Sequence, residues 1–221
     1  MVQVTKRLVA DQRYAVITAD VVRSRSFPDF RRKRDAKLGP LSKKHKAEAW
    51  IVSPYAVTVW DEFQGILSSP HLFPRVVFDL RRSFFPMELR IAIGIGKVTE
   101  PRKSPINQFA GGEAFERARY AMDRLKNNKA GKYRILTAVK SGDRILDVSL
   151  NTIYQLQDTL VGDISPKQWT TINWVMRTGS QELAAKKLGV NVSTVSRTLR
   201  RAHYWQVEDA CRATEEYLKL Y

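Results

Sequence analysis

The chain has 221 residues, of which 43% are hydrophobic and 27% charged, a composition that fits packed domains and excludes a disordered polypeptide. Its 38 Lys and Arg outnumber 22 Asp and Glu, and the net charge of +16 predicts a polyanionic partner, most simply nucleic acid. A single cysteine excludes an intrachain disulfide, and because the sequence shows no signal core and no long apolar run, we expect a cytoplasmic protein that does not bind membranes.

The first 160 residues are predicted to alternate strands and helices. Strands rich in Val and Ile are expected at 2–9 and 14–19, followed by a helix within the basic run 23–46 that Gly39-Pro40 should break or re-cap. The later elements are a strand hairpin at 55–60 and 64–67, a helix at 72–85 that Pro86 ends, a strand at 89–98, a helix at 112–125, a strand at 133–139 and a helix at 149–160.

This order of elements predicts the fold class. Strand, helix, hairpin, helix, strand, helix and strand in succession indicate an α+β domain with a mostly antiparallel sheet over residues 1–160. A boundary is expected near 161–163, just before Ser165-Pro166. Residues 161–221 should then form a small all-α domain.

The C-terminal domain has the spacing of a helix-turn-helix over about residues 165–203. Ser165 caps its first helix, and Trp169, Ile172, Val175 and Met176 give that helix an apolar face. A second helix at 181–188 is expected to turn Leu183, Ala184 and Leu188 inward. Gly189 supplies the left-handed residue of the turn, and Val190 is expected to fill the core behind it.

The third helix, expected at 194–203 with Ser193 as its cap, is the candidate DNA-reading element. Val195, Leu199 or Thr198, and Ala202 should be buried. Hydroxyl groups at a helix start can reach phosphates or base edges, and arginine can read guanine in the major groove. The expected DNA-contacting residues are Ser193, Thr194, Ser196, Arg197, Arg200 and Arg201. The alternatives are a plain three-helix packing unit with solvated arginines and a protein-docking helix, which would want apolar anchors on that face.

Most of the positive charge lies outside this module. Residues 151–221 carry 9 basic and 7 acidic residues, so residues 1–150 carry 38 − 9 = 29 basic and 22 − 7 = 15 acidic residues. We therefore expect the first domain, or a homodimer, to add phosphate contacts. A helical stripe at 204–221 could dock on its own domain or form that homodimer.

The basic run is the first candidate for phosphate binding in the first domain. Its expected phosphate-contacting residues are Arg23, Arg25, Arg31, Arg32, Lys33 and Arg34. They could follow a nucleic-acid backbone, where counterion release favours binding, or hold a triphosphate beside Asp20. A solvated charged surface is the simpler alternative.

Carboxylates stand where two strands are expected to end. Asp20 follows the strand at 14–19, and Asp61-Glu62 is expected at the tip of the hairpin. Two acids at adjacent strand ends can share divalent cations such as Mg²⁺ or Mn²⁺, which could hold a nucleotide. A strand-end cap at Asp20 and a solvated hairpin tip are the simpler alternatives.

Four segments, YAVITAD (14–20), DEFQ (61–64), RIAIGIG (90–96) and GEAFERAR (112–119), together with the helix-turn-helix, resemble the SatD family over most of the chain. More distantly, the first domain resembles the palm domain of class III nucleotide cyclases and GGDEF diguanylate cyclases. That resemblance implies a palm/ferredoxin-like sheet with Asp20 and Asp61 as metal ligands and Glu62 as a candidate third ligand.

The sequence departs from the cyclase pattern at positions that such chemistry needs. Val59 and Trp60 replace two glycines before the acids, and Glu116 and Tyr120 fall where an Asn and an Arg are required. We therefore assign no catalytic residue. From the helix-turn-helix spacing and the net charge of +16 we expect a transcriptional regulator that binds double-stranded DNA. Its first domain would sense a small-molecule or nucleotide ligand or add phosphate contacts. The alternative is a metal-dependent nucleotidyl-transfer or nucleotide-binding enzyme with a DNA-targeting module.

Overall fold

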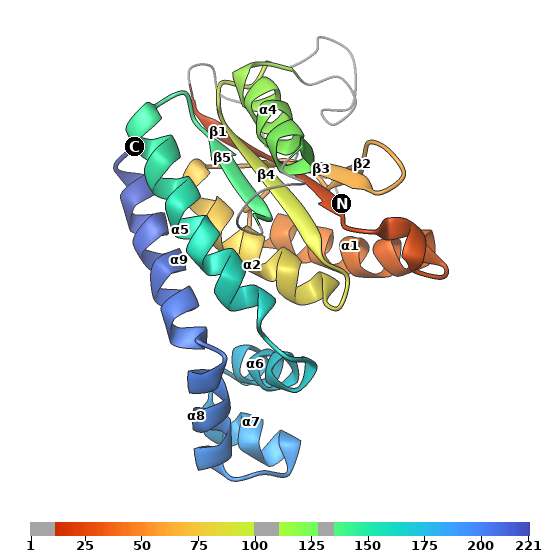
Figure 1. Ribbon diagram of the computed structural model, residues 1–221, viewed down its shortest axis with the longest axis vertical. Coiled ribbons are helices and arrows are strands. Elements are labelled where there is room, and N and C mark those ends of the chain that lie inside the picture. The colour runs from red at the N-terminus through yellow and green to blue at the C-terminus, as the bar shows by residue number, and fades with distance from the viewer. Residues whose placement is uncertain (1–11, 100–110, 128–134) are drawn as a thin grey trace.

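The computed structural model describes residues 12–99, 111–127 and 135–221. A five-stranded sheet carries helices on both faces, and a group of short helices projects from it (Figure 1). The predicted strand at 2–9 and the start of the one at 133–139 lie outside the described residues. The strands are β1 (Tyr14–Val21), β2 (Ala56–Val57), β3 (Glu62–Leu67), β4 (Leu89–Gly96) and β5 (Thr137–Lys140). The helices of this part are α1 (Phe30–Ala47), α2 (Phe73–Phe84), α4 (Glu113–Asn127) and α5 (Arg144–Gly162), with short 3₁₀ turns η1 (Ser24–Ser26) and η2 (Pro70–Leu72).

The predicted fold class is confirmed. The strand order is β2-β3-β1-β4-β5, and every pair is antiparallel except β4 with β5. The predicted sequence of strand, helix, hairpin, helix, strand, helix and strand is the observed one. Every residue of β1 is buried because the strand is central and helices cover both of its faces.

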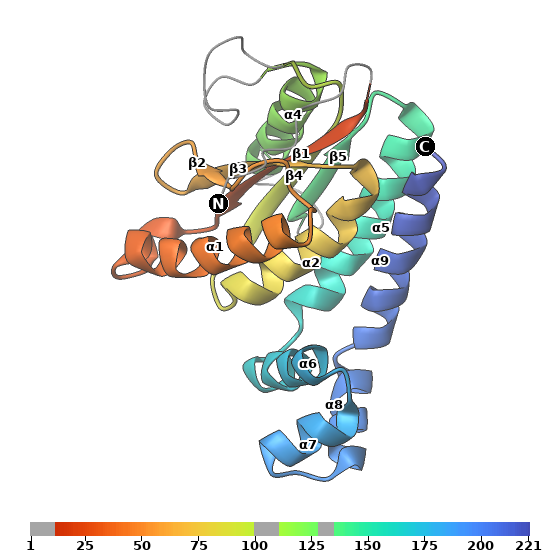
Figure 2. The ribbon, with the colours of Figure 1, turned by 180° about the vertical axis from the view of Figure 1, so that it is seen from behind.

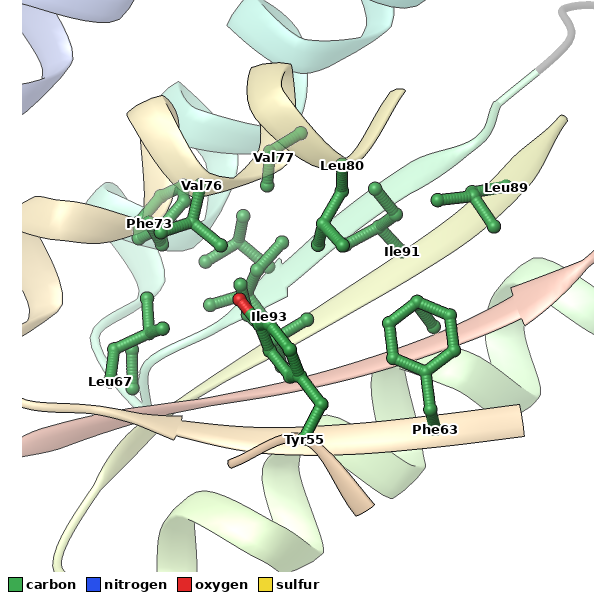
Figure 3. Close-up of a cluster of buried hydrophobic side chains, with 14 of the residues drawn as sticks. Tyr55, Phe63, Leu67, Phe73, Val76, Val77, Leu80, Leu89, Ile91 and Ile93 are labelled. Carbon is green, nitrogen blue, oxygen red and sulfur yellow. The ribbon is translucent and has the colours of Figure 1, made fainter. Parts of the chain in front are cut away.

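The larger core lies between the sheet and α1, α2 and α5. Val76 and Leu80 of α2 point toward Ile91 and Ile93 of β4 (Figure 3). The helix was expected at 72–85, and its observed apolar face confirms that periodicity.

Helix α4 covers the opposite face, and glycines of β4 allow it to come close. A Cβ built on Gly94 would lie 2.0 Å from the carbonyl oxygen of Ala114 and 2.3 Å from the nitrogen of Ala118. Only glycine fits there, since both contacts are with backbone atoms. The residues of β1, β3 and β4 that face α4 are therefore held within reach of its side chains.

Several boundaries differ from the predictions: the first hairpin strand is shorter than expected, at Ala56–Val57, and the second begins earlier, at Glu62. Two other differences have a clear local cause. Helix α1 continues through Pro40, because Gly39 and Pro40 face solvent, where the missing N–H leaves no buried carbonyl without a partner. Helix α5 begins five residues before the predicted start, because Asp143 accepts hydrogen bonds from the backbone nitrogens of Ile145 and Leu146.

The projecting group contains α6 (Pro166–Thr178), α7 (Gln181–Leu188) and α8 (Val192–Arg201), which are the three helices of the predicted helix-turn-helix, and a short turn joins α7 to α8 (Figure 2). Its core includes Trp169, Ile172, Val175, Ala184 and Leu199.

The last helix, α9 (Tyr204–Lys219), runs back along α2 and α5 (Figure 1). Val207, Thr214 and Leu218 of the predicted stripe are buried, whereas Tyr221 is exposed. The docked stripe is therefore covered by the chain itself, and a homodimer through this helix would have to use its other face. The division into residues 1–160 and 161–221 stays a prediction, since α9 packs on both parts.

Candidate nucleic-acid interface and carboxylate centre

Local sequence signals set the geometry of the projecting helices. Ser165 and Gln168 form a reciprocal capping box at the start of α6. Gly179 and Gly189 end α6 and α7 in the left-handed region, with φ of 66° and 65°. Because the left-handed conformation at Gly189 ends α7 abruptly, only a short turn separates α7 from α8, which begins at Val192.

The structure leaves one face of α8 open. Arg197, Arg200 and Arg201 are exposed, whereas Val195 and Leu199 face the core. Within the described part of the chain, none of the three arginines makes an ion pair. Ser193 is also exposed, and Thr194 and Ser196 are partly so.

Three details predicted for this module are wrong. Helix α8 begins at Val192 with Asn191 as its N-cap, so Ser193 lies in its first turn. Leu183 and Val190 were expected in the core, but they are 53% and 40% exposed. Ala184, Ala185 and Leu188 already fill the inner side of this short helix, and Leu183 is left on its flank.

The helices α6 to α8 are more basic than the domain average suggested. Residues 166–201 contain seven Lys and Arg and one Glu, a net of 7 − 1 = +6. Lys186 and Lys187 of α7, which were not among the predicted DNA-contacting residues, are exposed beside the turn. Counting charge by helix instead of by half-chain would have found them, since the acids of this region lie mainly in α5 and α9.

Specific contacts join this module to α2. Trp169 of α6 packs against the rings of Phe78 and Phe85, each with centroids 5.9 Å away. Arg82 donates a hydrogen bond to Asn173 of α6 at 2.7 Å, while its other nitrogens bind Asp79. The helix-turn-helix is thus fixed to the sheet domain by aromatic packing and a charged hydrogen bond.

The basic run 23–46 divides between the interior and the surface. Arg34 is buried and donates to the backbone oxygen of Trp60 at 2.6 Å, so its prediction as a phosphate contact is wrong. Lys37 donates to the carbonyl oxygens of Ser83 and Phe85 at the end of α2, and burial lowers its pKa. The predicted residues that remain exposed are Arg23, Arg25, Arg31, Arg32 and Lys33.

The exposed part of the run includes one stacked pair. The guanidinium carbon of Arg31 lies 4.2 Å from the centroid of the Trp60 ring. That arrangement keeps a cation beside an aromatic ring at the hairpin tip, where the Trp60 residue is 48% exposed.

The predicted carboxylates meet on the α4 face of the sheet. Asp20 and Glu62 are directly opposite each other in β1 and β3, and they are 4% and 1% exposed. Glu62 is the first residue of β3, so it does not occupy the solvated hairpin tip that was the simpler alternative. Asp61 is half-buried, and its carboxylate accepts a hydrogen bond from Ser24 at 2.7 Å.

Side chains of α4 and β4 neutralise this pair. Lys126 Nζ lies 3.4 Å from an oxygen of Asp20 and 3.1 Å from an oxygen of Glu62. Arg119 approaches Glu62 to 3.3 Å, and Arg90 approaches Asp20 to 3.2 Å. Lys126 and Arg119 are seven residues apart on one helix face, a spacing that could have identified them as partners.

The pKa values of the centre follow from burial and these contacts. Burial raises the pKa of Asp20, and the charges of Arg90 and Lys126 only partly oppose it. For Lys126, burial lowers the pKa, but the hydrogen bond to Glu62 and the charge of Asp20 outweigh it and the pKa is raised. The ammonium group of Lys126 therefore stays charged between the two acids.

The residues present do not fit the metal that the cyclase resemblance implies. Among residues 12–99, 111–127 and 135–221, no group of three or more His, Cys, Asp or Glu is placed to hold an ion. Asp61 turns toward Ser24, and Lys126 lies where a cation shared by Asp20 and Glu62 would have to bind. The predicted Mg²⁺ or Mn²⁺ ligand set of Asp20, Asp61 and Glu62 is therefore replaced by an internal ion-pair network.

The sequence of the chain matches one known protein family over most of its length. The model of the SatD family matches residues 14–203, from the start of β1 to the end of the helix-turn-helix. No curated protein sequence matches the chain. In the parts of the chain that the structure describes, none of the helices has the length and apolar character needed to cross a membrane.

Proposed function

The chain belongs to the SatD family, and we propose that it is a transcriptional regulator that binds double-stranded DNA through α8. The observation that carries the proposal is the open arginine face of this helix. Arg197, Arg200 and Arg201 are exposed on a module with a net charge of +6, and Ser193 and Thr194 stand at the start of the helix.

These side chains have the chemistry of a reading helix. A guanidinium group can make two hydrogen bonds to the O6 and N7 atoms of guanine, and each such pair contributes about 1–3 kcal/mol of base discrimination. Hydroxyl groups and backbone N–H groups at the start of α8 can bind phosphates. Lys186 and Lys187 of α7 would then contact the backbone on one side of the groove.

The sheet domain contributes in a second way under this proposal. Arg23, Arg25, Arg31, Arg32 and Lys33 are exposed and could add contacts to phosphates without base preference. The carboxylate centre would have a structural role, because its charges contact one another within the fold.

The test is fluorescence anisotropy of labelled random and genomic-fragment duplexes, titrated with the full chain over a salt series. Replacing Arg197 and Arg200 by alanine should weaken binding to the preferred fragment at least tenfold. The matched control replaces Arg124 and Arg144, which are also exposed and remove the same charge from α4 and α5. If both double variants lost the same DNA affinity, the effect would come from net charge alone, which would contradict the role of α8.

The alternative that the chain is a metal-dependent enzyme acting on nucleotides can be tested with the same protein preparation. Incubation with Mg²⁺ or Mn²⁺ and each nucleoside triphosphate, followed by chromatography, should leave the nucleotides unchanged. New products, together with flat anisotropy at low salt, would overturn the DNA-binding proposal and direct attention to Asp20 and Glu62.

A further inference from the structure

A pocket of about 290 Å³ lies where the sheet domain meets the projecting helices. Its walls come from α1, the segment after it, α2, α6 and α9. Figure 2 shows α6 next to the lower end of α2, with α9 running alongside. Small-molecule sites begin at about 300 Å³, so this pocket can hold a compact ligand of one or two rings.

The interior of the pocket is aromatic. Trp50, Phe78 and Tyr204 contribute ring surfaces, and the centroids of Phe78 and Tyr204 are 6.5 Å apart. Val207 and Met176 complete the apolar lining. Such walls favour a planar aromatic body over a sugar or a flexible polar chain.

The side chains that line the pocket include three acids and three bases, which form three ion pairs. Asp79 contacts Lys44, Glu208 contacts Arg212 and Glu215 contacts Arg75. The charge that a ligand meets therefore depends on basic partners from outside the lining.

Asp79 is neutralised more than once. It also binds Arg82 and accepts a hydrogen bond from His45, so the charge of Lys44 is in excess. Lys44 Nζ lies 5.4 Å from the centroid of the Trp50 ring, beside the aromatic wall. The ion pair between Arg212 and Glu208 is long, at 3.7 Å, which leaves the guanidinium able to accept another partner.

We propose that this pocket binds an aromatic carboxylate, with its ring against Trp50 and Phe78 and its carboxylate near Lys44 and Arg212. We further infer that the ligand changes the affinity of α8 for DNA, a step that rests on the proposed function. Met176 and Tyr204 connect the pocket to the helices on either side of the reading module, and Tyr204 begins α9 only three residues after α8 ends. A ligand that contacts both parts of the chain can favour one orientation of α8 over another.

The binding test uses 2-naphthoate and its uncharged analogue 2-naphthamide, titrated calorimetrically into the full chain without DNA. Naphthoate should bind at least tenfold more tightly than the amide. Met176→Trp, which fills the pocket from its partly exposed edge, should weaken naphthoate binding at least tenfold, whereas Val148→Trp on the exposed face of α5 should not. Arg212→Gln should weaken it more than Arg144→Gln.

Absence of binding at millimolar naphthoate, or equal binding to the Met176→Trp and wild-type chains, would overturn the pocket assignment. Equal affinity for the amide would overturn the anionic part. The regulatory step is measured separately, by DNA titration with and without saturating naphthoate. A change of about fivefold or more is expected, with the same factor for naphthoate binding in the presence of DNA. If naphthoate and DNA both bind but neither changes the affinity of the other, the coupling is refuted. If the chain binds naphthoate but does not bind DNA, the proposed function is refuted and the pocket assignment stands.

Discussion

Arg82 of α2 and Asn173 of α6 are joined by a 2.7 Å hydrogen bond that connects the sheet domain to the helix-turn-helix. The same guanidinium group holds the buried carboxylate of Asp79 at 2.8 Å. A single guanidinium group thus links α6 to a carboxylate that is buried in the first domain.

The first prediction concerns this connection. Asn173→Ala removes one hydrogen bond to a charged group and should lower the free energy of unfolding by about 1.5–3 kcal/mol. Thr170→Ala, on the exposed side of the same helix, should have a smaller effect in urea unfolding. If the two substitutions cost the same, the hydrogen bond between Arg82 and Asn173 does not contribute to stability.

The second prediction concerns the buried carboxylate of Asp79. Burial by itself raises its pKa, but hydrogen bonds from His45 and Lys44 and the charge of Arg82 outweigh burial and hold the pKa well below its usual range. A depressed pKa contributes stability above the unfolded-state pKa of about 3.9, and that stability is lost as pH falls toward the folded-state pKa.

The corresponding experiment compares Asp79→Asn with the wild-type chain in urea at several pH values. Breaking a buried ion pair by removing one partner costs about 3–5 kcal/mol, and that deficit should be complete near pH 7. It should shrink below about pH 4, where the wild-type chain loses its advantage. A deficit that does not change with pH would show that Asp79 acts by packing.

The third prediction concerns Asp20, for which the pH dependence of stability should be opposite to that of Asp79. The pKa of Asp20 is raised by burial, so its contribution to stability is present at low pH and is lost as pH rises through the folded-state pKa. The free energy of unfolding of Asp20→Asn should therefore compare best with that of the wild-type chain near neutral pH. It should fall increasingly below the wild-type value toward pH 4. Measured midpoints that converge as pH falls would contradict the raised pKa.

The fourth prediction concerns the close approach of α4 to the sheet. Gly94→Ala forces a methyl group against backbone atoms of Ala114 and Ala118, and the resulting overpacking should cost about 1–3 kcal/mol or more. Gly162→Ala is the matched control, because a Cβ there meets nothing within 4 Å. Thermal unfolding should show destabilisation in the first variant and a gain of about 0.4–1 kcal/mol in the second.

The fifth prediction separates phosphate binding from base reading. Replacing Lys186 and Lys187 by alanine should weaken binding to all duplexes about equally. The slope of log affinity against log salt should become shallower by about 0.9 for each phosphate that the variant no longer neutralises. Replacing Arg197 should instead reduce the preference between duplexes. An unchanged salt slope in the lysine variant would remove α7 from the interface.

Local signals in the sequence determined the order of the elements and the helix-turn-helix spacing. Ser165, Gly179 and Gly189 act within a few residues of their own position, by capping or by adopting a left-handed conformation. The content of Val and Ile likewise predicted the strands β1 and β4, since β-branched side chains favour the extended backbone at their own positions. The basic character of α8 was also predictable, because it depends only on the residue types within that helix.

Only the tertiary structure decided which charges face solvent and which are neutralised inside the fold. Arg34 turns toward Trp60, Lys126 reaches Glu62 across 64 positions of sequence, and Arg82 reaches Asn173 across 91. No local pattern encodes such pairs, because burial makes an unpaired charge costly and the nearest partner depends on how distant elements pack. The composition of the chain predicts a polyanionic partner, but the packing of α2, α4 and α9 selects the cations that remain available to bind one.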